Sequence, residues 1–100
     1  MVKLIEVCKP NNYTTLGDKT KYTLKEVFIN PQHVVCLRED NLARRHLVEG
    51  RMPPGLDERQ EFTKVHINRG QSGIDITVVG NPVMIEQQLN LEKQQVLLKG

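Results

Sequence analysis

The sequence predicts a mainly β domain of the α+β class: a small antiparallel sheet, curled or barrel-like, with a helical insertion and a C-terminal helix. Two stretches, 22–37 and 62–79, alternate apolar and polar residues as half-buried strands do. The chain has two Tyr, two Phe and no Trp, so Val, Ile and Leu must form most of the core, which favours strands. Its 100 residues fit one domain, 1–100.

The first half of the chain predicts three strands, at 2–8, 22–29 and 33–38. Residues 10–20, which are rich in Asn, Gly and other turn formers, are expected to form a long exposed hairpin loop. Asn30-Pro31 ends the second strand, because Pro lacks an N–H donor and restricts the residue before it.

An insertion at 39–60 begins with a short helix, expected over 41–49. Asp40 is a suitable N-cap and Gly50 a suitable residue just after the helix. A helix this short needs packing support, and it is indicated by the i, i+4 spacing of four residues: Leu42, Ala43, His46 and Leu47. The run Met52-Pro53-Pro54-Gly55 then forces an irregular turn.

The second half predicts two strands, at 62–68 and 74–79, and a terminal helix. A hairpin loop over 68–73 joins the strands, with Gly70 and Gly73 expected at positive φ. Asn81 as N-cap and Pro82 at the first helical position open the helix. The apolar tail 96–98 favours an extra edge strand, and a longer helix through Lys93 is the alternative.

The overall charge is nearly balanced, with 14 basic and 12 acidic residues and a net charge of +2, which gives little long-range attraction to nucleic acid or membrane. The chain has no apolar run near 18 residues, and its first residues lack a signal-peptide pattern, so a cytoplasmic location is expected. Cys8 and Cys36 both lie in apolar strand-like runs, where reduced thiols are expected. A disulfide stays open if the two strands are neighbours.

Metal binding and catalysis are not expected. Cys8, His33, Cys36 and His66 could be imagined around zinc, but His33 and Cys36 are three apart on a strand and point to opposite faces. Ser72 does not sit at a strand-to-helix junction, and Cys36, a partner for His33 or His66 in a thiolate pair, is expected to be buried. We therefore expect no metal, no cofactor and no enzyme activity.

The hairpin loop at 68–73 offers a second kind of site. Its backbone amides could cradle an anion, with Arg69 adding charge. It lacks the helix and the Lys-Ser/Thr of a phosphate-binding P-loop, so an ordinary hairpin turn is favoured.

All six arginines lie in or beside the insertion, which makes it the candidate binding surface. We expect contacts with a protein partner or with other copies of the chain through Arg44, Arg45, Arg51 and Arg59. Residues 38–69 carry seven basic and six acidic residues, and such mixed charge suits a protein interface. One alternative is a nucleic-acid-binding regulator that uses the same arginines with Arg69 and Lys64 against phosphates. The other is a purely structural loop whose arginines pair with its own acids.

Three segments carry a resemblance to known proteins: residues 3–7 (KLIEV), 27–37 (VFINPQHVVCL) and 74–82 (IDITVVGNP). Their pattern is similar to that of flagellar FlbD-type proteins and of small proteins of tailed phages. In those groups an Asn-Pro turn joins two strands and a later strand enters a helix. The insertion most resembles the T4-like phage members, and FlbD-type proteins lack it. The resemblance implies a fold and a viral origin, and it implies no catalytic residues.

Overall fold

The computed structural model describes the backbone of residues 1–9 and 21–99, and the side chains of those residues as far as Leu91. Its elements are β1 (Val2–Cys8), β2 (Thr23–Ile29), the 3-10 helix η1 (Pro31–His33), β3 (Val34–Glu39), α1 (Asn41–Val48), β4 (Phe62–Arg69), β5 (Ser72–Val79) and α2 (Pro82–Lys99). The predicted α+β class is confirmed. The loop expected at 10–20 lies outside the described residues.

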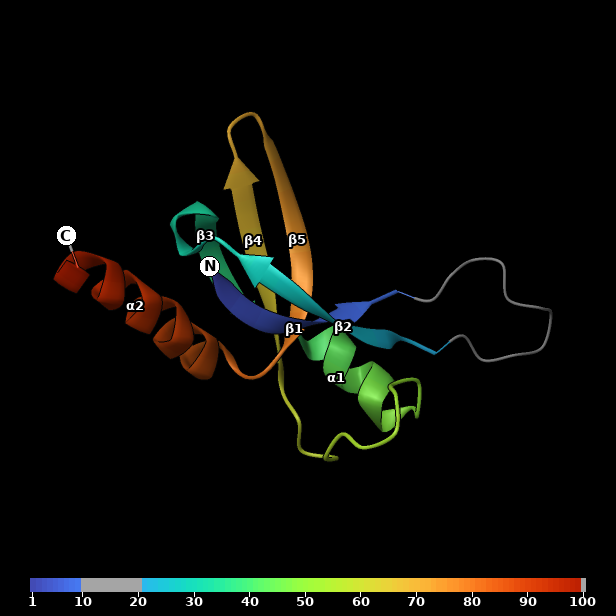
Figure 1. Ribbon diagram of the computed structural model, residues 1–100. Coiled ribbons are helices and arrows are strands. Elements are labelled where there is room, and N and C mark those ends of the chain that lie inside the picture. The colour runs from blue at the N-terminus through green and yellow to red at the C-terminus, as the bar shows by residue number, and fades with distance from the viewer. Residues whose placement is uncertain (10–20, 100) are drawn as a thin grey trace.

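The strands form an antiparallel sheet in the order β2-β1-β5-β4-β3 (Figure 1). β2 and β3 follow one another in the chain yet lie at opposite edges, and η1 carries the chain between them. Asn30 caps this turn by accepting a hydrogen bond from the Gln32 amide (3.0 Å). A barrel would need a ladder between the first and last strands. No such ladder joins β2 to β3 in the described part of the chain, so the expected curled or barrel-like closure is wrong.

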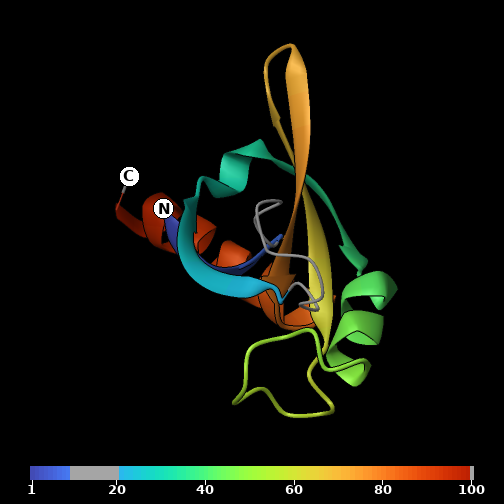
Figure 2. The same cartoon turned by 90° about the vertical axis from the view of Figure 1, so that its right-hand side faces the viewer.

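The two helices pack on opposite faces of the sheet. Residues three apart on a strand point to opposite faces, so β4 directs Phe62 to one face and Val65 to the other. Val65 packs in a cluster with Ile85 and Leu89 of α2, whereas Phe62 packs in a second cluster with Ala43 of α1. We call these the α2 face and the α1 face. In Figure 2, α1 (green) lies to the right of β4 and β5, and most of α2 (red) lies to their left.

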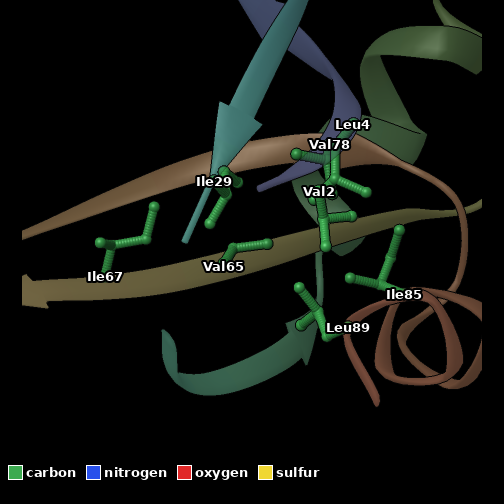
Figure 3. Packing of buried hydrophobic residues seen from close by; sticks show 8 residues of the cluster. All are labelled: Val2, Leu4, Ile29, Val65, Ile67, Val78, Ile85 and Leu89. Atoms are coloured by element: carbon green, nitrogen blue, oxygen red, sulfur yellow. The ribbon is translucent and has the colours of Figure 1, made fainter. Parts of the chain in front are cut away.

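The larger cluster forms most of the core on the α2 face. Figure 3 shows its members: Val2, Leu4, Ile29, Val65, Ile67, Val78, Ile85 and Leu89. Each fully buried Val, Ile or Leu contributes about 1.5–3 kcal/mol relative to exposure. Ile85 and Leu89 lie one turn apart on α2, so this pair anchors the helix to the sheet.

α2 begins as predicted, and its length fits the alternative of a helix that continues through Lys93. The Met84 amide donates to Asn81 Oδ1 (2.8 Å), which confirms Asn81 as the cap before Pro82. The helix continues to Lys99, so the strand predicted at 96–98 is wrong. No Gly or Pro interrupts the chain between Pro82 and Lys99, and its Glu, Gln, Leu and Lys residues favour the helix.

The β4–β5 hairpin is tighter than the sequence suggested. Arg69 pairs directly with Ser72, so the strands continue to a two-residue turn in which Gly70 has φ of 83°. The six-residue loop expected at 68–73 is therefore wrong, and Gly73 does not adopt positive φ. Gly73 instead leaves room for a neighbour: a Cβ added there would lie 2.9 Å from His66 Cε1.

Candidate binding surface on α1 and the sheet

The start of α1 is held by one buried carboxylate. Asp40 is 7% exposed, and its Oδ1 accepts a hydrogen bond from the Ala43 amide (3.0 Å), as the side chain of a helix N-cap does. Its Oδ2 accepts the Thr77 hydroxyl of β5 (2.6 Å). The predicted cap is confirmed, and the same carboxylate also fixes α1 onto the sheet.

Only a few side chains of α1 face inward and pack against the domain. Ala43 is buried against the Phe62 cluster, Leu47 packs at its margin, and the His46 ring lies 4.9 Å from the ring of Tyr22. Leu42 shares their helical spacing but does not join them, and it is 57% exposed.

The segment after α1 is folded against the sheet. Met52 is buried in the same cluster, and the Tyr22 amide donates to the Arg51 carbonyl oxygen (2.9 Å). Where this segment enters β4, the Phe62 carbonyl oxygen accepts a hydrogen bond from the Asp40 amide (2.9 Å). The insertion is therefore part of the packed domain rather than a projecting arm.

Two of the four insertion arginines are engaged within the chain. Arg44 Nη1 donates to the carbonyl oxygens of Gln60 (3.0 Å) and Glu58 (3.3 Å), which ties α1 to the returning loop. Arg51 forms an ion pair with Glu49 (3.7 Å). These two arginines have structural partners.

The other predicted cations lie on separate surfaces. Arg45 on α1 and Arg59 in the loop are exposed, and neither side chain has an ion pair within the described residues. Arg69 lies near the hairpin tip and lines a hollow on the α2 face, whereas Lys64 points to the α1 face from the middle of β4. The six predicted residues therefore do not form one continuous cationic patch.

The outer side of α1 carries an exposed stripe of apolar and arginine side chains that was not predicted from the sequence. Leu42, Arg45 and Val48 are spaced three apart, are all exposed, and place apolar side chains on both sides of one guanidinium. Val48 is 75% exposed. The spacing was readable in the sequence, but the direction in which the helix docks was not. We call these residues the α1 stripe.

A polar row crosses the sheet beside α1. Cys36 of β3, His66 of β4 and Asp75 of β5 are direct neighbours in the register, and His66 Nδ1 lies 2.6 Å from Asp75 Oδ1. The imidazole leans over Gly73 and away from β3, and no hydrogen bond joins it to Cys36 in the described part of the chain. The row therefore lacks the thiol–imidazole contact that a cysteine nucleophile requires.

Both cysteines are free thiols. Cys8 on β1 and Cys36 on β3 are separated by β5 and β4, so the disulfide left open by the sequence does not form. Partial burial raises the pKa of the Cys8 thiol, the Glu6 carboxylate raises it further, and Lys25 opposes the shift.

Within the described residues, no three His, Cys, Asp or Glu side chains lie close enough together to hold a metal ion. Neither α1 nor the described part of α2 combines the length and apolar character needed to cross a bilayer.

Comparison of the chain with models of protein families, with curated proteins and with solved structures finds no match. The resemblance to FlbD-type and tailed-phage proteins stays a prediction.

Proposed function

We propose that this protein is a non-enzymatic interaction module that binds a protein partner, or a second copy of itself, through the α1 stripe. The observation that carries the proposal is the exposure of Leu42 and Val48 on either side of Arg45. A short helix in water normally turns its apolar residues inward. Protein interfaces combine apolar side chains with Arg and are depleted in other charges at their centre.

The helix that carries the α1 stripe is held in place by contacts with the rest of the domain. Asp40, Ala43 and Arg44 fix the helix to β5, to the core and to the returning loop, so little conformational entropy remains to be lost on binding. The exposed Arg59 in the neighbouring loop is a second cation that such a partner could contact.

Nucleic acid fits this surface less well than protein does. Phosphate contacts need several free cations along one face, and Arg44 and Arg51 already have partners in the chain. Apolar side chains at two of the three stripe positions also suit a protein surface better. The two free thiols agree with a cytoplasmic location, which is part of the proposal.

The test replaces Leu42 and Val48 together by Ser and uses Val83→Ser, an exposed position on α2, as the matched control. The immobilised proteins are incubated with lysate of the encoding organism, and self-association is followed by sedimentation velocity. We expect the double variant to lose at least tenfold in retention of a protein that wild type and control both hold, or in self-association. Equal retention and equal sedimentation for all three proteins would contradict the proposal.

A further inference from the structure

Two cations face each other on the open part of the α1 face. Arg38 of β3 and Lys64 of β4 are direct partners in the antiparallel register, so their side chains leave the same face of the sheet. Both are exposed. Like charges directly opposite one another on an antiparallel pair lower stability unless an anion lies between them.

The nearby carboxylates do not supply that anion. Asp75 is engaged by His66 Nδ1 (2.6 Å), and both oxygens of Asp40 accept hydrogen bonds, one from the Ala43 amide and one from Thr77. Neither Arg38 nor Lys64 forms an ion pair within the described residues.

The space around these cations fits a small anion. Arg38 and Lys64 line an open hollow of about 390 Å³, together with Cys36, His66 and Asp75. A guanidinium can hold two oxygens of an oxyanion at once, and an ammonium adds a point charge from the opposite strand. We propose that this hollow binds a single phosphate group between Arg38 and Lys64.

The surroundings favour a small phosphorylated molecule or free phosphate over a nucleic acid. Asp75 lines this hollow and Asp40 lines the neighbouring one together with Lys64, so their negative charge disfavours a chain of phosphates more than a single phosphate. Among the described residues that line it, the hollow has no Phe, Tyr or Trp on which a base could stack, and its one imidazole, that of His66, is engaged with Asp75. The site does not involve the α1 stripe, so it can fail or hold independently of the proposed function.

The test measures the thermal unfolding midpoint in phosphate and in chloride at equal ionic strength and pH, for wild type, Lys64→Gln, Arg38→Gln and the control Lys25→Gln. Phosphate should raise the midpoint of wild type and control above the chloride value, because a ligand that binds the folded state stabilises it. The two site variants should lose this increment. In chloride at low salt, Lys64→Gln should be at least as stable as wild type, because the like-charge pair is gone.

Amide chemical shifts then separate the sources of phosphate. Inorganic phosphate and glycerol 3-phosphate should perturb residues 36, 38, 64, 66 and 75, with affinity weakened at least tenfold by Lys64→Gln. An equal phosphate increment in wild type and in both site variants would overturn the site. Single-stranded oligothymidylate binding more tightly than glycerol 3-phosphate at the same residues would overturn the assignment to a small ligand.

Discussion

The hydroxyl of Thr77 donates a 2.6 Å hydrogen bond to Asp40 Oδ2 and so ties the start of α1 to β5, the central strand of the sheet. The other carboxylate oxygen caps the helix. One buried side chain therefore sets both the beginning of α1 and its position on the sheet.

Replacing Asp40 by Ala should lower the free energy of unfolding by about 2–3 kcal/mol, because a helix cap and a hydrogen bond to a charged group are both lost. Thr77→Val should cost about 1 kcal/mol, since the cap survives. Urea unfolding of the two single variants and the double variant measures the coupling. The double variant should be little less stable than Asp40→Ala, and strictly additive losses would show that the two side chains act separately.

The effect of Gly73→Ala on stability should depend on whether the His66 ring is present. Ala is normally better than Gly in a strand by about 0.5–1 kcal/mol, but a Cβ at position 73 would press on the His66 ring that holds Asp75. Gly73→Ala should therefore stabilise a His66→Ala protein. In the wild-type background the same substitution should stabilise the protein less, or should destabilise it.

Chemical denaturation of these four proteins gives the comparison. Equal effects of Gly73→Ala in the two backgrounds would mean that the ring does not need the space above Gly73.

The raised pKa of Cys8 predicts slow alkylation at neutral pH, because the thiolate is the reactive form. The contribution of Cys8 to stability should be fully present below the ordinary thiol pKa of 9.0 and be lost as the pH rises through the higher folded value. Iodoacetamide rates against pH, in a Cys36→Ser protein, report Cys8 alone.

The alkylation midpoint should be higher in the folded protein than in urea. Glu6→Gln should lower the folded midpoint, because it removes a negative charge that raises the pKa, and Lys25→Gln should raise it. A folded midpoint at or below the value in urea would contradict this assignment.

The local parts of the fold could be predicted from the sequence because their causes are local. Asp40 and Asn81 as caps, Pro31 as a strand end and the alternation of β5 each depend on neighbouring residues. The tail at 96–98 was misread because a short apolar run fits a strand as well as a helix.

The candidate sites depend on contacts between distant segments. The spacing of Leu42, Ala43 and Leu47 indicates a helix but not which of its sides packs, and only the docking of α1 on β5 turns Leu42 outward. Arg38 and Lys64 pair across the whole insertion that separates them in the chain, so no local sequence pattern predicts the pairing. Arg44 was grouped with Arg45 for the same reason, although its partners are carbonyl oxygens 14 and 16 residues away.

The two adjacent arginines of α1 have different roles in our proposal: Arg44 maintains the fold and Arg45 contacts a partner. Arg44→Ala should lower the free energy of unfolding by about 1 kcal/mol, because two carbonyl oxygens lose their donor. Arg45→Ala should change it by less than about 0.5 kcal/mol.

The most direct measurement is therefore the binding of Arg45→Ala in the retention and sedimentation assays, made on protein whose unfolding is unchanged. We predict that retention or self-association falls at least tenfold for Arg45→Ala and stays near wild type for folded Arg44→Ala. Undiminished binding by Arg45→Ala, or a greater loss with Arg44→Ala, would contradict it.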